Sequence, residues 1–307
     1  MIVISFHLNY LSFISINDKG EKKIVEKTGI LDFPIDFNNK LLNDGNIESF
    51  FEEILKKIKN NLNYHDNNFL ISIPTKMVLF DLNTIDFNTN FQSISKLNNM
   101  TSQVKYGQKI VNSFKKRVYP FYDEKDIVSL LSVSFNEDFI SRIEMYFRKN
   151  NYKLNGVFVN ILTSLNTIMK LVNKNIKSFS LISYNDDNEI EFIKVKNNII
   201  TIYLRYKKTA GDNIVYYVKS GEYSKGMIEL LKKDINEKYF QYTDKIYLVG
   251  SRKQQDKIKY IANKISFAEV INPFDIFKNS NSMMLGKNLP SYYYNDNVFV
   301  ATTGLIL

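Results

Sequence analysis

Several residue types are absent or rare in this chain of 307 residues, and each absence excludes a kind of site. There is no cysteine, which excludes disulfides, thiolate metal sites and cysteine nucleophiles. The only histidines are His7 and His65, too few for a histidine-rich metal site. No apolar run approaches the roughly 20 residues of a membrane-spanning helix, and Met1 leads directly into a strand pattern without a signal peptide. We therefore expect a soluble cytoplasmic protein.

The motifs of common nucleotide-binding and hydrolytic enzymes are missing as well. The sequence contains no GxGxxG, GxxxxGK, GxSxG or HExxH. What is present is ordinary for a globular protein, with 44% hydrophobic and 24% charged residues. The length suffices for one large domain or for two of about 150 residues.

The net charge of +9 is unevenly distributed. Residues 1–150 carry 19 basic and 18 acidic side chains, whereas residues 151–307 carry 22 and 14. A basic second half could contact anionic lipid, an acidic partner or nucleic acid, or it could simply be a solvated surface. No aromatic-plus-basic RNA-binding signature accompanies the charge, so nucleic acid is the least favoured partner.

Hydrophobic periodicity predicts a three-strand meander followed by alternating helices and strands, and it does so twice. The first set comprises strands at 2–7, 11–16, 23–31, 69–73, 127–135 and 154–159, and helices at 47–62, 136–149 (capped by Asn136) and 161–172. The second set comprises strands at 178–184, 189–195, 199–205, 246–249 and 267–271, and helices at about 223–236 and 252–265. Two mixed sheets with helices packed on them are therefore expected.

Residues 75–126 interrupt the first set with a less regular pattern. They hold a strand candidate, VLFDL, then a polar stretch and a basic piece at about 103–117 that we expect to be helical. The exit contains Tyr119, Pro120 and Phe121. We expect this segment to form an insertion or a small subdomain.

Several segments, taken in order, resemble the PilM group of type IV pilus and type II secretion assembly proteins, which have an actin-like fold. They are ISIPTKMVLFDL, YPFYDEKDI, IVSLLSVSFNEDFISRIEMYFRKNNYKLNGVFVNILTSLNTI, RYKKTAGDNI, KIYLVGSRKQQDKIKYIANKIS, FAEVINPFDIF and VFVATTGLIL. The resemblance implies an α/β fold of two RNase H-like subdomains, each with a mixed five-stranded sheet and helices. It places the first subdomain at 1–74 and 127–175, the inserted small subdomain at 75–126 and the second subdomain at 176–307.

The resemblance also implies a nucleotide site whose chemistry is degenerate. Actin-like ATPases hold phosphate with two hairpins, each carrying an acidic residue for magnesium and a glycine that lets backbone N–H groups approach. In the first hairpin Ser5 stands where the acid belongs and His7 where the glycine belongs, with Leu8 and Tyr10 crowding the loop. His7 could donate a hydrogen bond to phosphate, although a lone histidine at a strand end is more often a packed or capping group.

The second hairpin and the third loop depart from the pattern as well. Ser183 replaces the second acid, and no glycine follows it. Asp186 and Asp187 could supply carboxylates, although a polar hairpin tip explains them equally well. The third loop keeps Gly250 but has Ser251 where a second glycine is usual. We expect a vestigial site made of Ser5, His7, Asn9, Ser183, Asn185, Gly211, Gly250 and Ser251, with no catalytic residue, no metal site and no cofactor, ATP and magnesium being disfavoured.

The function that the resemblance implies is a cytoplasmic scaffold, peripheral to the inner membrane through its partners. Such a scaffold would dock the cytoplasmic peptide of a single-span inner-membrane assembly protein, and it could contact other machine components or form a homo-oligomer. Peptide capture needs a groove with apolar pockets. Its candidate residues in the insertion are Phe80, Tyr106, Tyr119 and Phe121. The alternatives are an active actin-like ATPase or a sugar-kinase-like phosphotransferase, both of which need the lost phosphate-binding residues.

Overall fold

The computed structural model groups the chain into two compact units. It describes residues 1–18, 23–33, 37, 47–62, 66–84, 114–123, 126–172, 176, 178–211, 214–221, 245–278, 283–286 and 297–307. Unit 1 comprises Met1–Met77, Asn136–Val172 and Ile271–Leu307, and unit 2 comprises Val78–Phe135 and Asn173–Val270.

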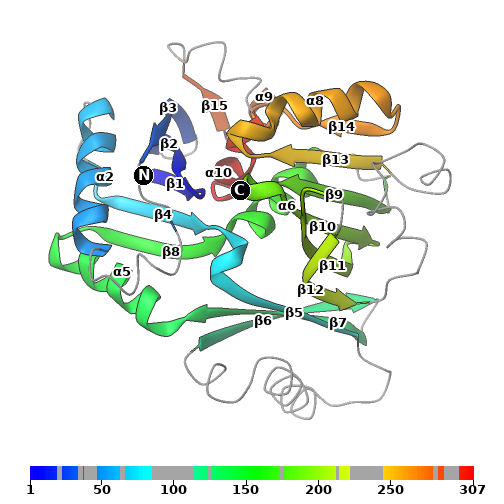
Figure 1. Ribbon diagram of the computed structural model, residues 1–307. Helices are drawn as coiled ribbons and strands as arrows, with labels where there is room; N and C mark the ends of the chain where they lie inside the picture. The colour runs from blue at the N-terminus through cyan, green and yellow to red at the C-terminus, as the bar shows by residue number, and fades with distance from the viewer. Residues whose placement is uncertain are drawn as a thin grey trace. The chain divides into compact units, whose positions relative to one another are not determined.

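Unit 1 is built on a six-stranded mixed sheet of order β15-β3-β2-β1-β4-β8 (Figure 1). Its strands are β1 (Ile2–Phe6), β2 (Tyr10–Asp18), β3 (Lys23–Asp32), β4 (Asn68–Ile73), β8 (Lys153–Val159) and β15 (Met283–Leu285). The central strand β1 is antiparallel to β2 and parallel to β4. All five residues of β1 are buried, Ser5 among them, as expected for a mostly apolar strand covered on both faces.

Helices cover both faces of this sheet. They are α2 (Ile47–Leu62), α5 (Glu137–Lys149), α6 (Asn160–Leu171), α9 (Asp275–Lys278) and α10 (Val300–Gly304), with short 3₁₀ turns at Thr75–Met77 and Asn297–Phe299. Phe6 meets Phe51 of α2 at a ring-centroid distance of 5.5 Å. Val3 points to the opposite face and packs in one cluster with Phe274 and Phe299. The single strand β1 therefore anchors both layers of helices.

Local sequence explains where two of these helices form. The apolar residues of α2 recur on one face and are buried, while the intervening charged residues are exposed. Helix α5 begins where the side chain of Asn136 accepts a hydrogen bond from the backbone N–H of Phe139 at 3.0 Å. Acidic residues lie in its first turn and basic residues in its last, which suits the helix dipole.

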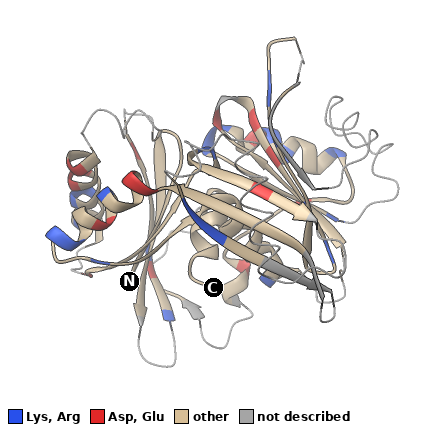
Figure 2. Cartoon of the chain, turned by 90° about the horizontal axis from the view of Figure 1, so that it is seen from below, with Lys and Arg blue, Asp and Glu red and all other residues tan. Residues whose placement is uncertain are grey.

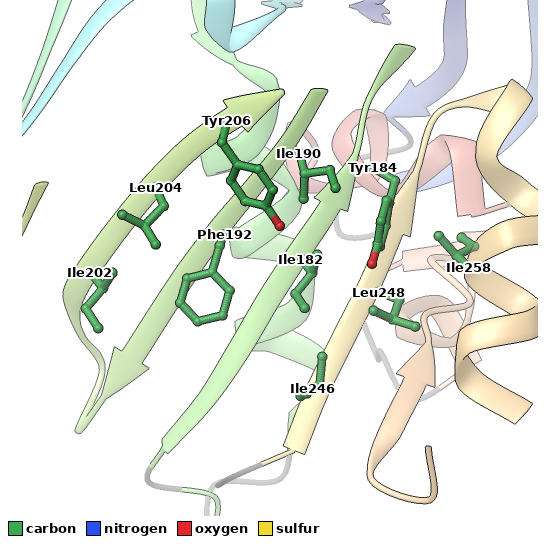
Figure 3. Packing of buried hydrophobic residues seen from close by; sticks show 10 residues of the cluster. All are labelled: Ile182, Tyr184, Ile190, Phe192, Ile202, Leu204, Tyr206, Ile246, Leu248 and Ile258. Carbon is green, nitrogen blue, oxygen red and sulfur yellow. The ribbon is translucent and has the colours of Figure 1, made fainter. Parts of the chain in front are cut away.

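Unit 2 repeats the strand order on a second six-stranded sheet, β12-β11-β10-β9-β13-β14. Its strands are β9 (Ser178–Tyr184), β10 (Glu189–Lys196), β11 (Ile199–Lys208), β12 (Ile214–Gly221), β13 (Lys245–Gly250) and β14 (Ala268–Val270). Helix α8 (Gln255–Lys264), preceded by a 3₁₀ turn at Arg252–Gln254, covers one face. The apolar side chains on that face form the cluster of Figure 3: Ile182, Tyr184, Ile190, Phe192, Ile202, Leu204, Tyr206, Ile246, Leu248 and Ile258.

A three-stranded sheet of order β5-β7-β6 completes unit 2 (Figure 1). Its strands are β5 (Val78–Thr84), β6 (Phe114–Asp123) and β7 (Asp126–Asn136). Phe80 of β5 is fully buried and lies on Tyr203 of β11, with the ring centroids 3.9 Å apart. This contact attaches the small sheet to the face of the larger sheet that α8 leaves open.

The predicted α/β class and the repeated strand order are confirmed, whereas several details differ. Each large sheet has a sixth strand, because β15 extends the first and β12 the second. The piece expected to be helical at 103–117 is strand β6 from Phe114 on, and its earlier part lies outside the described residues. The helix expected at about 223–236 also lies outside them.

The packing divides the chain at other points than the expected boundaries. Strands β5, β6 and β7 group with the second unit rather than adding to the first, because β5 packs on β11 and β12 and β6 packs on β11. Residues 271–307, expected in the second subdomain, group with unit 1. There β15 pairs with β3, and α10 packs on α6.

Candidate functional site

The hydroxyl of Ser5, the first position of the expected nucleotide site, is buried within unit 1. Ser5 has 0% exposure, and its Oγ lies 2.7 Å from Oγ of Ser72 on β4. The strand register places Ser5 beside both Ser72 and Ser12, and Ser12 in turn bonds the hydroxyl of Thr302 at 2.6 Å. The Ser5 hydroxyl is thus part of an internal row of hydroxyls and carries no charge for a metal ion.

His7 occupies the turn after β1 as a packed, neutral side chain. Its ring is stacked on Tyr10 with centroids 4.3 Å apart, and its backbone N–H donates to the carbonyl of Tyr10 at 2.8 Å. Although the residue is partly exposed, its Nε2 atom is buried and makes no hydrogen bond with the described residues. Burial lowers the pKa of His7 to about 3. At neutral pH the imidazole is therefore uncharged and offers no cation to a phosphate.

The turn that follows His7 forms backbone hydrogen bonds with a later segment of the chain. The carbonyl of Asn9 accepts the backbone N–H of Phe33 at 3.0 Å, and the carbonyl of Leu8 accepts that of Phe37. The ring of Phe37 is stacked on Phe6 with centroids 4.5 Å apart. A small-residue loop that presents N–H groups to phosphate is replaced here by a packed turn.

The second hairpin, in unit 2, contains a closed network of polar side chains. Ser183 donates its hydroxyl to Oδ1 of Asn185 at 3.0 Å. Asn185 donates through Nδ2 to Oε2 of Glu191 at 2.7 Å, and the hydroxyl of Tyr203 donates to Oε1 at 2.9 Å. Glu191 is only 2% exposed. A carboxylate does lie beside Ser183 in the strand register, but each of its oxygens accepts a hydrogen bond from the protein.

The environment of Tyr203 keeps its phenol protonated. Burial, followed by the nearby carboxylate of Glu191, raises the pKa of Tyr203 well above its ordinary value. The phenol therefore stays protonated at neutral pH and remains a donor to Glu191. Within this network Ser183, Asn185 and Tyr203 each donate a hydrogen bond, and both oxygens of Glu191 accept one.

The third loop, after β13, is tied to the second hairpin. Ser251 is 4% exposed, and its backbone N–H donates to the carbonyl of Tyr184 at 2.8 Å. Its hydroxyl donates to Oδ1 of Asp186 at 2.9 Å. Asp186, which could have supplied a carboxylate, thus takes part in a contact between the loops.

The structure brings together most of the expected site residues of unit 2. Ser183 and Asn185 bond directly, and the register pairs Gly250 with Tyr184, which places Ser251 beside the same hairpin. Gly250 has a packing role, because a Cβ there would lie 3.2 Å from Cγ2 of Ile258. Gly211 lies exposed in the turn after β11, where its backbone N–H donates to the carbonyl of Thr209 at 2.9 Å.

The groove residues have different environments. Phe80 belongs to the core of unit 2, since its ring is fully buried on Tyr203. Tyr119 on β6 is 39% exposed, and the adjacent Val118 is 37% exposed. The backbone of Phe121 belongs to β6, and Tyr106 lies outside the described residues.

Glu191, Tyr203 and Ser72 were not expected from the sequence. The available signal for Glu191 was a charge in the middle of the apolar run IEFI, which alternation alone would assign to solvent. The role of Ser72 depends on the register between β1 and β4, which no local pattern reveals.

The described side chains of the two hairpins do not fit a magnesium nucleotide. Magnesium is held mainly by carboxylates and phosphate oxygens, and neither hairpin offers an uncommitted carboxylate among the described side chains. Over the part of the chain that the structure describes, no group of three or more His, Cys, Asp or Glu residues is placed to hold a metal ion. In that same part, every helix is too short or too polar to cross a bilayer.

Comparisons with known proteins match this chain by structure only. No protein-family model and no curated protein sequence matches it. The PilM–PilN type IV pilus biogenesis complex matches with a TM-score of 0.69 at 8% identity, over 99% of this chain and 96% of that one. The cytoplasmic domain of EpsL, an inner-membrane component of the type II secretion system of Vibrio cholerae, matches with a TM-score of 0.48 at 7% identity, over 99% and 93%. An inorganic polyphosphate/ATP-glucomannokinase from Arthrobacter sp. strain KM matches with a TM-score of 0.41 at 6% identity, over 99% and 96%. The chain therefore has an actin-like fold and is similar over nearly its whole length to a chain of the PilM–PilN complex.

Proposed function

We propose that this chain is a non-catalytic actin-like scaffold of a pilus or secretion machine, and that it docks a peptide of a membrane-anchored assembly protein. Two observations support the proposal together. The fold is like that of a chain in the PilM–PilN complex. In this chain, the polar side chains of the two hairpins expected to hold phosphate bond to one another or to neighbouring side chains of the protein. Transition-state stabilisation in phosphoryl transfer depends on positioned charge and metal. Ser5 and His7 carry no charge at neutral pH, and both oxygens of Glu191 already accept hydrogen bonds, from Asn185 and Tyr203.

The peptide surface that this scaffold offers is centred on strand β6. Within the described part of the chain β6 pairs only with β7, so its other edge can accept an extended peptide through main-chain hydrogen bonds. Tyr119 and Val118 are exposed there. Phe80 supports the surface from beneath, because its buried ring holds β5 on Tyr203. Lys115 and Arg117 are also exposed on β6, which favours an acidic peptide.

Isothermal titration calorimetry tests the catalytic half of the proposal. We expect no heat of binding for ATP with magnesium up to millimolar concentration, and no phosphate release. Micromolar binding that disappears in a Ser5→Ala or Ser183→Ala variant would instead favour the active ATPase, which is the competing function.

Capture of the membrane partner tests the docking half. The partner's cytoplasmic peptide should bind the wild type and bind the Tyr119→Ala variant at least 10-fold more weakly, since apolar side chains at such contacts carry much of the affinity. Tyr260→Ala, at an exposed tyrosine of helix α8, is the matched control and should bind like the wild type. Equal binding by the wild type and the Tyr119→Ala variant would place the peptide elsewhere.

A further inference from the structure

The apolar residues of helix α8 lie on the side of the helix that faces the sheet, and most of its charged residues lie on the opposite side. Ile258 is fully buried in the cluster of Figure 3, and Ile261 and Ala262 pack against that cluster. Gly250 permits this close approach, because a Cβ there would crowd Ile258 at 3.2 Å. The helix is thus fixed on the sheet through its apolar side, and it runs beside β13 and β14 (Figure 1). Gln255 donates to the carbonyl of Gly250 at 2.8 Å, and the ammonium of Lys257 lies 4.8 Å from the ring centre of Tyr184, while most other polar side chains of the helix are exposed.

The outer face is strongly basic. Lys and Arg residues occur on several helices and strands of the chain with Asp and Glu among them, so net charge alone selects no surface (Figure 2). Residues 252–264 combine five basic side chains with one acidic side chain, Asp256, on one short helix and the turn before it. All five basic side chains are exposed: Arg252, Lys253, Lys257, Lys259 and Lys264. We call this set, with Tyr260, the basic face.

An exposed aromatic ring lies within the basic face. Tyr260 is 64% exposed, more than any other large hydrophobic side chain among the described residues. The ammonium group of Lys264 lies 5.8 Å from the centre of its ring. A tyrosine ring beside lysines is suited to a membrane interface, where the ring meets the headgroup region and the lysine stems extend toward phosphate.

We propose that the basic face of α8 binds the anionic phospholipid surface of a membrane. This inference goes beyond the peptide docking proposed above and does not depend on it. A single helix packed on a sheet presents a convex outer surface, which can lie against a planar bilayer. A single strand of nucleic acid and an extended peptide are instead bound in grooves or along strand edges, which a helix surface lacks.

The expected strength follows from the charge. A basic residue near an anionic leaflet contributes about 1 kcal/mol, which corresponds to about a five-fold change in partitioning. Neutralising three lysines should therefore weaken binding by about 100-fold. Binding should also fall as salt shortens the Debye length from about 10 Å at 0.1 M to about 3 Å at 1 M.

Vesicle co-sedimentation tests the proposal with the full chain. The wild type should sediment with phosphatidylglycerol–phosphatidylcholine vesicles and remain in solution with phosphatidylcholine alone. The triple variant Lys253→Gln, Lys259→Gln, Lys264→Gln should lose most of this binding. The matched control is Lys56→Gln, Lys153→Gln, Lys196→Gln, which removes the same charge from exposed lysines elsewhere and should bind like the wild type.

Fluorescence adds a measurement that does not rest on removing charge. The chain contains no tryptophan, so Tyr260→Trp introduces a single reporter in the basic face. Its emission should shift to the blue on anionic vesicles and should be quenched by brominated lipid. Met145→Trp, at a residue of α5 that is 60% exposed, is the control and should show no shift.

The outcomes separate the possible ligands. Loss of sedimentation in the α8 variant alone, with a blue shift only at position 260, supports the proposal. Equal loss in both triple variants would show attraction by net charge and overturn it. Failure of the wild type to bind anionic vesicles would also overturn it, whether or not the basic face binds single-stranded RNA or an acidic peptide instead. Peptide capture through Tyr119 is measured separately, so either proposal can fail alone.

Discussion

His7 shows how one side chain can change the chemistry of a loop. A glycine at this position would let backbone N–H groups approach a phosphate, whereas the imidazole ring is stacked on Tyr10 and fills the turn. Because burial keeps the ring neutral, His7 fills the loop without adding a charge to it.

The pKa of His7 predicts how stability depends on pH. The pKa is about 3 in the folded chain and about 6.5 when unfolded, so between these values the unfolded state binds more protons. The contribution of His7 should therefore reduce the free energy of unfolding as pH falls below about 6.5, by up to about 2 kcal/mol between pH 7 and 5. Urea denaturation at a series of pH values between 7 and 5 measures this change in the free energy of unfolding.

The His7→Phe variant is the reference for this measurement. It keeps a flat ring on Tyr10 and removes the titrating group, so the difference in unfolding free energy between variant and wild type isolates His7. That difference should grow on acidification from pH 7 to 5. Parallel stability curves for the two chains would show that the ring is protonated without cost in the folded state.

At the scale of elements, helices α6 and α10 approach each other closely at one glycine. A Cβ placed on Gly304 would meet the carbonyl oxygen of Thr163, the two atoms lying only 1.8 Å apart. Near that point Asn166 donates to the carbonyl of Gly304 at 2.9 Å, and Thr167 to that of Val300 at 2.7 Å. The backbones of the two helices therefore lie too close for any side chain between them.

Gly304→Ala should consequently destabilise unit 1. The clash is with backbone rather than with a movable side chain, so we expect a loss of about 3 kcal/mol in the free energy of unfolding. Gly156→Ala is the control, because there the added Cβ meets only the ring of Phe158, which is 37% exposed and can move. Its cost should be below about 1 kcal/mol. Similar melting temperatures for both variants would contradict this account of the α6–α10 contact.

The elements that the sequence predicted well are those whose burial is decided locally. Helices α2 and α5 and strands β9 to β11 begin and end within a few residues of the expected positions, because their apolar periodicity matches the face that they bury. The first four residues of strand β6, 114–117, were expected to be helical. Its run of lysine and arginine follows no alternation, and its pairing with β7 decides its conformation.

The candidate site was only partly predictable for the same reason. Ser5, His7 and Ser183 could be identified from their places at strand ends. The hydrogen-bond partners around Ser5 and Ser183 could not be predicted, because strand pairing brings Ser72, Glu191 and Tyr203 to these positions. The unit boundaries depend likewise on contacts between distant segments, such as β15 with β3.

At the scale of the whole molecule, the last segment of the chain should be required for unit 1 and dispensable for unit 2. A chain ending at Val270 lacks β15 and α10, and with them Phe274 and Phe299 of the unit 1 core. Hydrogen exchange should then show lost protection in β1 and β2 and retained protection in β9 and β10. Protection lost equally in both units would mean that they unfold as one cooperative body.

The hydrogen bond between the hydroxyls of Ser12 and Thr302 has a consequence for biosynthesis. Ser12 is made early and Thr302 late, so during synthesis the N-terminal strands gain this partner only after all of unit 2 has been made. Unit 2 can mature earlier, while β1 and β2 still expose apolar surface. During that interval the nascent chain should depend most on chaperones. A ribosome that stalls before residues 271–307 are made would leave unit 2 folded and the sheet of unit 1 incomplete.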